Sequence, residues 1–350
     1  MPVSAVNRRM RTLARCLALV TSLALPLLAA CAPRFIPMGP PVTAPHIDMT
    51  SAAGHQGFGE MTMADGTQLS LRSWLPKDQP KAVIVALHGF NDYSNAFDMP
   101  GAYWAERGVA TYAYDQRGFG RAPDAGRWAD TATYIDDLRS AAKLLRARHP
   151  GLPLFVLGES MGGAITMMAM TDAAPPDVDG VILVAPAVWD RSHMPFYQTW
   201  ALWIASNTVP WMALSAKGLD IMPSDNIDML RKLSADPLVI KSTRVDAIRG
   251  LVDLMDDAFE AAPKLAARTL MLYGSRDEVV PEAPSLDVMS RLPRDGKHQF
   301  ALYGRGFHML LRDLQAQFVW DDVLAWIATP AGKLPSGADA AADARVRGPA

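Results

Sequence analysis

Short, continuously apolar runs recur through the middle of this 350-residue chain, and they constrain its fold more than any other feature. Helical patterns separate most of them, notably at 134–148 and 314–327. Continuous apolar strands that alternate with helices are typical of a mostly parallel sheet covered on both faces, which predicts an α/β fold. The strand-like runs are 82–87, 109–114, 154–157, 181–184, 269–273 and 299–303.

The interval between the fourth and fifth of these runs is far longer than a crossover helix requires. We therefore predict an inserted helical cap at about 188–265 within a domain that spans 56–328. A hairpin is expected at the start of this domain, with strands at 60–63 and 68–74. The segment 329–350 has no apolar period and is predicted to be a disordered tail.

Composition excludes one class of partner. Half of the residues are hydrophobic, enough for a large core. The formal net charge is −2, with acidic and basic residues interspersed. A nucleic-acid surface would need a basic stripe, so no nucleic-acid partner is expected.

The N-terminal segment reads as a targeting signal. Four arginines precede or open the apolar stretch 16–30, which is short for a membrane span. Residues 1–30 are therefore predicted to be a secretory signal peptide, and the proline-rich 31–55 a tether. Leu28-Ala29-Ala30-Cys31 resembles the lipobox of bacterial lipoproteins. The resemblance implies a lipidated Cys31 and a lipid-anchored protein of the bacterial cell envelope, with the outer membrane favoured by Ala32.

Two other interpretations of this segment stay open, an ordinary signal peptide with a nearby cysteine and a short membrane anchor. Cysteine usage favours lipidation. The only two cysteines are Cys16, within the segment to be removed, and Cys31, at the expected cleavage point.

The stretch FVLGESMGG holds a G-x-S-x-G pattern, Gly158 to Gly162, around Ser160. An apolar run precedes it and good helix formers follow, so the serine falls at a strand-to-helix turn. So sharp a turn needs neighbours without a Cβ, which accounts for the two glycines. The alternative is a glycine-rich turn with a capping serine.

A serine nucleophile needs a base within reach and an acid to orient that base. In an open parallel sheet, reactive groups gather at the carboxyl ends of strands. Asp277 follows the run 269–273, and His308 follows 299–303. Taken singly, Asp277 could be a helix N-cap and His308 a solvated loop residue. The order Ser160, Asp277, His308, each after its own strand, is the order of the α/β-hydrolase triad.

An oxyanion in the transition state requires preorganised N–H donors. One donor is expected to be the amide of Met161, directly after the serine. The second is expected from Phe90, in the loop after 82–87. The neighbouring His88 is expected to order this loop rather than to act as a second base.

These motifs together resemble the monoacylglycerol lipase and lysophospholipase branch of the α/β-hydrolases, which is also grouped with serine aminopeptidase-like hydrolases. The resemblance covers roughly 57–329 and implies the α/β-hydrolase fold, Ser160 as nucleophile, His308 as base, Asp277 as its orienting acid, and no metal or organic cofactor. Two loops, 89–93 and 116–122, differ from the family's usual Gly-x-Gly-Glu-His and His-Gly-His-Gly-x-Ser. The motifs are LHGFNDYS, YDQRGFGRA, LGESMGG, SADPLV, YGSRDEVVP and GRGFHMLLRD.

The leading functional hypothesis is hydrolysis of small acyl esters, such as monoacylglycerols or lysophospholipids, through an acyl-enzyme. The cap is rich in tryptophan and methionine, and Trp200, Trp203 and Ile204 recur at helical spacing. We expect Trp189, Trp200 and Trp203 to line an acyl channel, although this face could instead pack on the main domain.

Two rival functions stay open at this point. An aminopeptidase would need carboxylates for the substrate's amine, for which Asp220, Asp225 and Asp228 are candidates, though solvated loop carboxylates are the simpler interpretation. A non-catalytic envelope lipoprotein would have no need of an intact triad. The sequence leaves the oligomeric state undetermined.

Overall fold

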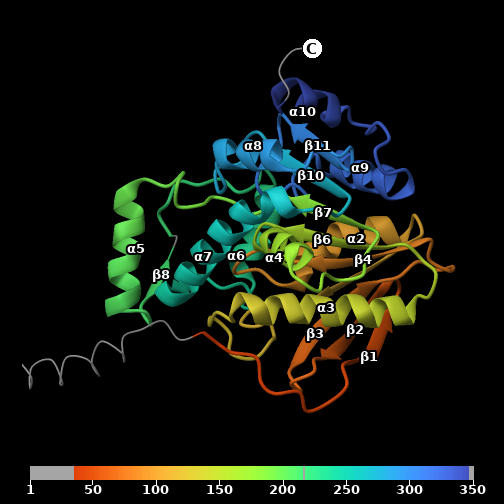
Figure 1. Ribbon diagram of the computed structural model, residues 1–350. Helices are drawn as coiled ribbons and strands as arrows, with labels where there is room; N and C mark the ends of the chain where they lie inside the picture. The colour runs from red at the N-terminus through yellow and green to blue at the C-terminus, as the bar shows by residue number, and fades with distance from the viewer. Residues whose placement is uncertain (1–34, 216, 347–350) are drawn as a thin grey trace, which may run out of the picture.

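A nine-stranded sheet forms the centre of the computed structural model, which describes residues 35–215 and 217–346 (Figure 1). The strand order is β1-β2-β3-β5-β4-β6-β7-β10-β11. Strands β5, β4, β6, β7, β10 and β11 run parallel, whereas β1, β2 and β3 pair antiparallel at one edge. The strands are β1 His46–Ala53, β2 Gln56–Thr62, β3 Gln68–Trp74, β4 Ala82–Leu87, β5 Val109–Tyr114, β6 Leu154–Glu159, β7 Gly180–Val184, β10 Thr269–Gly274 and β11 His298–Tyr303.

Both faces of the sheet are covered, which is why its central strands are continuously apolar. Along β4, Val83 and Val85 point into one core and Ile84 into the other, as the two-residue period of a strand requires. Helices α3 Thr131–Arg148, α4 Met161–Thr171 and α7 Val245–Ala261 cover the first face. Helices α2 Asp98–Ala105 and α9 Ala316–Ala328 cover the second. The predicted α/β-hydrolase sheet is confirmed.

The insertion between β7 and β10 contains α5 Phe196–Thr208, β8 Ala213–Ser215, α6 Ile227–Ala235, β9 Ser242–Arg244, α7 and the short η2 Ala262–Lys264. Only its first part stands apart from the sheet, with α5 at the side of the molecule (Figure 1). Helix α7 belongs to the main core, because Leu254, Ala258 and Phe259 are buried there. It serves as the crossover that leads the chain back to β10, so the cap proper is shorter than the predicted 188–265.

The predicted tether is partly folded. Strand β1, within 31–55, pairs with β2 from His46 to Ala53, with a register shift between Met49 and Ser51. Upstream, the Ile36 amide donates to the Trp128 carbonyl at 2.7 Å, and Phe35 packs against the core. Alternation in β1 is present but short, since polar and apolar residues alternate only over 46–50, directly after a proline-rich stretch. Residues 1–34, with the predicted signal peptide and Cys31, lie outside the described part.

The predicted disordered tail is also wrong over its described part. Residues Ala338–Val346 form α10, which lies against the β11 edge (Figure 1). Ala342 is fully buried and Leu334 nearly so. Alanine buries a small surface, so a helix that packs through alanines lacks the strong apolar period by which helices are recognised. Within residues 35–215 and 217–346, no helix is both long and apolar enough to span a bilayer.

Candidate active site

Ser160 sits at a strained turn between β6 and α4. Its backbone has φ 52° and ψ −115°, a left-handed conformation that favours glycine. The turn needs close approach of backbones, since a Cβ on Gly158 would lie 2.3 Å from the Gly162 carbonyl oxygen. A Cβ on Gly162 would lie 2.2 Å from the Leu87 carbonyl oxygen. The two glycines of the G-x-S-x-G pattern are therefore steric requirements, as predicted.

Hydrogen bonds hold this turn in place. The Ser160 amide donates to the Val184 carbonyl at 2.9 Å, and the Ser160 carbonyl accepts from Ala187 at 2.9 Å. Both partners come from the neighbouring strand β7 and the residues after it. The strain is thus offset by the sheet around it, and the side chain is presented at the carboxyl end of the strands.

Asp277 and His308 meet across the loops after β10 and β11. The Nδ1 atom of His308 lies 2.7 Å from Oδ2 of Asp277. The other carboxylate oxygen, Oδ1, accepts the amides of Val279 and Val280, each at 2.8 Å. Both oxygens of Asp277 are therefore engaged, which orients the imidazole and leaves Nε2 for the cavity.

The pKa of His308 lies above its ordinary value. Burial by itself would lower that pKa, because it disfavours the charged imidazolium. The carboxylate of Asp277, by charge and by hydrogen bond, and that of Glu159 oppose this and prevail, although Arg312 works against them. Negative charge next to the imidazole thus favours the protonated ring that a general base becomes during turnover.

Ser160 and His308 open onto one cavity of about 520 Å³. In the part of the chain that the structure describes, no hydrogen bond joins Ser160 Oγ to His308. Such bonds are often long without substrate and shorten when it binds. The cavity places the serine, the imidazole and the loop after β4 around one space where a reacting carbonyl can lie.

Of the two residues expected to supply oxyanion donors, Phe90 lines this space and Met161 directly follows Ser160, which lines it too. Met161 is the first residue of α4, so its N–H has no acceptor within the helix. Gly89, which precedes Phe90, lies against the serine, since a Cβ there would be 3.3 Å from the Ser160 Cβ. The Phe90 ring packs edge to face on Phe119 at 5.6 Å between centroids, which fixes the loop.

His88 holds the same loop through hydrogen bonds to backbone groups. It is fully buried, its Nδ1 lies 2.8 Å from the Gly89 carbonyl, and its Nε2 accepts the Gln116 amide at 3.0 Å. Burial lowers the pKa of His88, which keeps the ring neutral. Both nitrogens are occupied by backbone groups, in agreement with the expected ordering role.

The loop after β4 is also bonded to the cap. Asn91 donates from Nδ2 to Oγ1 of Thr243 at 2.7 Å, and its carbonyl accepts the Ile240 amide at 3.0 Å. The hydroxyl of Tyr93 donates to Asp236 at 2.6 Å. One side of the candidate oxyanion loop therefore rests on the inserted segment.

A buried ionic cluster, formed by Asp92, Glu159 and Arg312, lies in the cavity wall and was not anticipated from sequence. The Arg312 guanidinium donates to Asp92 at 2.7 Å and to Glu159 at 3.3 Å. Burial raises the pKa of Glu159, against the lowering effect of Arg312. The available signal was that each of three motifs around the expected site, LHGFNDYS, LGESMGG and GRGFHMLLRD, carries a charged residue that has no role in the expected triad or oxyanion hole.

The inserted segment covers the cavity with a mostly apolar surface, in which Gln198 is the polar side chain of α5. Trp189 lines the cavity, as expected, together with Leu202 of α5 and Met255 of the crossover helix α7. Trp200 and Trp203 do not line it, contrary to expectation, and are 61% and 55% exposed on the outer face of α5. The helical spacing identified an apolar face correctly, but this helix directs that face away from the sheet.

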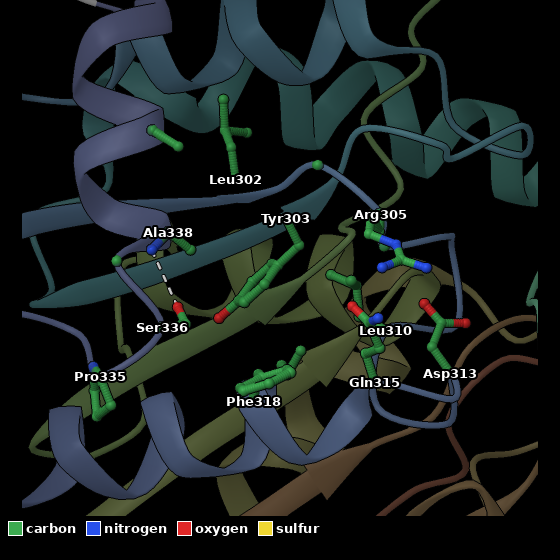
Figure 2. Close-up of a pocket in the computed structure, with 15 residues that line it drawn as sticks. Leu302, Tyr303, Arg305, Leu310, Asp313, Gln315, Phe318, Pro335, Ser336 and Ala338 are labelled. Carbon is green, nitrogen blue, oxygen red and sulfur yellow. Dashed lines mark hydrogen bonds between the residues drawn. The ribbon is translucent and has the colours of Figure 1, made fainter.

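A second cavity, of about 400 Å³, lies on the other side of the segment after His308. Figure 2 shows Tyr303 and Phe318 in its middle, with Arg305 and Asp313 toward one end. It shares no lining residue with the catalytic cavity. Across the described residues, no group of three or more His, Cys, Asp or Glu side chains is placed to hold a metal ion.

A parallel sheet with a serine at a strained strand-to-helix turn after β6, and an Asp–His pair from the ends of β10 and β11, defines an α/β-hydrolase. The chain belongs to the hydrolase family described as serine aminopeptidase, S33, whose model matches residues 78–315.

Named relatives carry lipase activities. The chain is 25% identical over 266 residues to a monoacylglycerol lipase of Mycolicibacterium smegmatis, covering 75% of this chain and 94% of the relative. It is 23% identical over 279 residues to human monoglyceride lipase, covering 78% and 91%. Among solved structures, a Paleococcus ferrophilus monoacylglycerol lipase superposes with a TM-score of 0.63 at 22% identity, over 75% of this chain and 98% of that one.

Proposed function

We propose that the protein is a carboxylic ester hydrolase that works through an acyl-enzyme on Ser160. The observation that carries this proposal is the Asp277–His308 pair, fixed at 2.7 Å and opening onto the same cavity as Ser160. The relatives with named activities are lipases, which supports ester hydrolysis in particular.

The proposed reaction follows from this arrangement. Nε2 of His308 takes the proton of Ser160 as Oγ attacks the ester carbonyl. The N–H groups of Phe90 and Met161 stabilise the oxyanion that forms. His308 then returns the proton to the departing alkoxide, which leaves as an alcohol. Water, deprotonated by His308, attacks the acyl-enzyme and releases the carboxylic acid and the free serine.

We propose medium-chain or long-chain monoacyl esters as substrates. A cavity of about 520 Å³ has room for an aliphatic chain, and the inserted segment contributes mostly apolar groups to it, such as Trp189, Leu202 and Met255. Apolar walls also exclude bulk water from the acyl-enzyme. Monoacylglycerols and lysophospholipids both fit this description.

An aminopeptidase, which the family's printed name would suggest, is the weaker candidate. A substrate's ammonium group needs an unpaired carboxylate in the cavity. Among the described cavity residues, the carboxylates are Asp92 and Glu159, and each already contacts Arg312. None of the three acidic residues considered from sequence lines the cavity. Asp220 is exposed, Asp225 accepts the Leu314 amide, and Asp228 is exposed beside Arg231.

A non-catalytic role is disfavoured by the backbone of Ser160. A positive φ at a residue with a Cβ costs on the order of 1–3 kcal/mol. A binding protein of this fold would gain stability by replacing that serine with glycine. The strained serine is useful where Oγ must be exposed to a substrate.

We further propose that Cys31 is lipidated and anchors the protein in the bacterial cell envelope, in the outer membrane. Phe35, where the described chain begins, comes four positions after Cys31, a reach of at most about 14 Å. So short a connection would hold the domain at the lipid surface. The exposed aromatic face of α5, with Trp200 and Trp203, suits such a boundary.

The function is tested with the full-length chain and a fluorophosphonate probe. Labelling of the wild type and not of Ser160→Ala is expected, with turnover highest on long-chain monoacyl esters, lower on acetate esters and lowest on aminoacyl amides. Labelling that survives Ser160→Ala would refute the assigned nucleophile. Faster turnover of aminoacyl amides than of esters would favour the aminopeptidase.

A further inference from the structure

One guanidinium contacts the segments that carry all three parts of the proposed reaction centre. Arg312 lies four positions after His308, and its Nη1 donates to Oδ2 of Asp92 at 2.7 Å. Its Nη2 donates to Oε2 of Glu159 at 3.3 Å. All three charged side chains are more than nine-tenths buried.

Each carboxylate stands next to a residue of the reaction centre. Asp92 comes two positions after Phe90, and its Oδ1 accepts the amide of Tyr93 at 2.9 Å within the same loop. Glu159 ends β6 and directly precedes Ser160. Arg312 therefore joins the oxyanion loop, the nucleophile turn and the segment that carries the base.

We propose that Arg312 is a positioning residue that holds these three segments in catalytic register, an inference that rests on the proposed ester hydrolase function. The oxyanion loop is also held by His88, by Phe119 and, through Asn91, by Thr243 of the inserted segment. None of these contacts reaches the nucleophile turn or the base, so the ionic link from Asp92 through Arg312 is what couples the loop to both.

A role in stability alone does not account for this cluster. Two carboxylates and one guanidinium carry an excess negative charge, and burying them costs desolvation free energy. Within the described part of the chain, Oε1 of Glu159 and Nε of Arg312 are buried without a hydrogen-bond partner. Apolar residues of similar size would stabilise the same space at least as well. Costs of this kind are retained where they serve a site.

The cluster also acts on the base through its charge. The charged and titratable groups around Arg312 are Asp92, Glu159, Asp313, His88 and His308. Of these, Glu159 raises the pKa of His308 and Arg312 lowers it. A change at Glu159 should therefore alter the pH profile as well as the rate.

The first test compares Arg312→Met with Arg312→Lys in the full-length protein, with kcat and KM measured on a short soluble ester. Arg312→Met is expected to lower kcat on the order of 100-fold, the scale of one lost oxyanion donor, with KM changed less than about threefold. Lysine keeps the charge, but one ammonium group cannot bind both carboxylates. The kcat of Arg312→Lys is therefore expected to exceed that of Arg312→Met by less than about tenfold. Full rescue by lysine, or an effect on KM alone, would overturn the proposal.

The second test guards against simple misfolding. The variant Arg312→Met/Asp92→Asn/Glu159→Gln carries no buried charge in the cluster, and should unfold at a denaturant concentration close to that of the wild type. Its kcat, normalised by active-site titration, should stay on the order of 100-fold low, and an alkyl boronate that mimics the tetrahedral anion should bind correspondingly more weakly. Wild-type kcat in this variant would refute the positioning role.

A matched control and a pH measurement complete the design. Arg231→Met removes an exposed arginine that pairs with Asp228 at 2.9 Å, and should leave kcat unchanged. Glu159→Gln should move the acid limb of kcat/KM to lower pH, because a charge that raises the pKa of His308 is lost. An acid limb at the wild-type pH would contradict the inference.

The fluorophosphonate probe separates failure of this inference from failure of the proposed function. If the wild type itself does not react with the probe, the proposed function fails. Labelling of Arg312→Met at the wild-type rate refutes only the positioning role.

Discussion

His308 and Asp277 are 31 positions apart in the chain, yet Nδ1 of the first lies 2.7 Å from Oδ2 of the second. The contact is possible because β10 and β11 are parallel neighbours and end at the same edge of the sheet. The second oxygen of Asp277 is held by the amides of Val279 and Val280. The carboxylate thus reaches the imidazole as a fixed group, and the first two predictions depend on it.

Replacement of any member of the proposed triad should strongly reduce kcat for ester hydrolysis. Ser160→Ala or His308→Ala is expected to lower kcat by something on the order of 10⁴ to 10⁶, with Asp277→Asn milder, because the three residues act as a unit. The double variant of Ser160 and His308 should be little worse than either single one. Steady-state kinetics on a chromogenic ester measure this, with Ser290→Ala, a surface serine, as control. Substantial turnover by Ser160→Ala would rule the mechanism out.

The pH profile should reflect the raised pKa of His308. The base acts as neutral imidazole, so kcat/KM should fall as pH drops through a pKa above the ordinary 6.5. Asp277→Asn removes the main raising charge and leaves burial to lower the pKa, so the acid limb of its residual activity should move to lower pH. The same shift makes the free energy of unfolding depend on pH. Because the pKa of His308 is higher in the folded than in the unfolded protein, it stabilises the fold fully below the unfolded-state pKa, and this contribution is lost as pH rises through the folded-state pKa. An acid limb below that of an ordinary imidazole would contradict the assignment.

Backbone strain at the nucleophile turn predicts that two inactive variants of Ser160 differ in stability. Ser160→Gly can adopt φ 52° without a Cβ clash, whereas Ser160→Ala cannot. The glycine variant should be more stable than the alanine variant by about 1 kcal/mol, the lower end of the strain expected there. Denaturant unfolding of both proteins, at equal m-values, provides the comparison. Equal midpoints would show that the surrounding hydrogen bonds leave no strain to relieve.

The structure moves the expected acyl contacts from the outer to the inner face of α5. Leu202→Trp should fill the cavity and slow long-chain esters at least tenfold relative to acetate esters, because one side chain occupies the space of several methylenes. Trp203→Ala, on the exposed face, should leave the ratio between these soluble substrates unchanged. Hydrolysis of a chain-length series measures both. If only Trp203→Ala slowed long-chain esters relative to acetate esters, the acyl chain would bind at the outer face of α5 instead of in the cavity.

Anchoring is tested at the N-terminus. The mature protein should begin at a lipidated Cys31, and Cys31→Ser should yield soluble or unprocessed protein. Each buried methylene contributes about 0.8 kcal/mol, so several acyl chains would anchor the domain firmly. Mass spectrometry of the N-terminal peptide, together with fractionation of the envelope, distinguishes the outcomes. An unmodified Cys31 would exclude lipidation, and an N-terminus upstream of it would favour a short membrane anchor.

Much of the fold could be predicted because its signals are local. The central strands and helices α3 and α9 were located within a few residues, since continuous apolar runs and amphipathic periods depend on neighbouring residues alone. Ser160, Asp277 and His308 could be singled out for the same reason, since each lies within a few residues of the end of a strand. Strand β1 was missed because its alternation covers only 46–50, next to a proline-rich stretch. Helix α10 was missed because an alanine-rich helix buries little surface and leaves a weak pattern.

By itself, the sequence determined that a parallel sheet forms and which side chains stand at its carboxyl edge, because both follow from residues within a few positions of one another. Only the tertiary structure decided which face of α5 turns toward the cavity, and that Asp92, Glu159 and Arg312 meet. Such choices depend on how elements remote in the chain pack together. The largest separation within the cluster is the 220 positions between Arg312 and Asp92. Because these charges are buried and have lost contact with water, they are stabilised by pairing with each other.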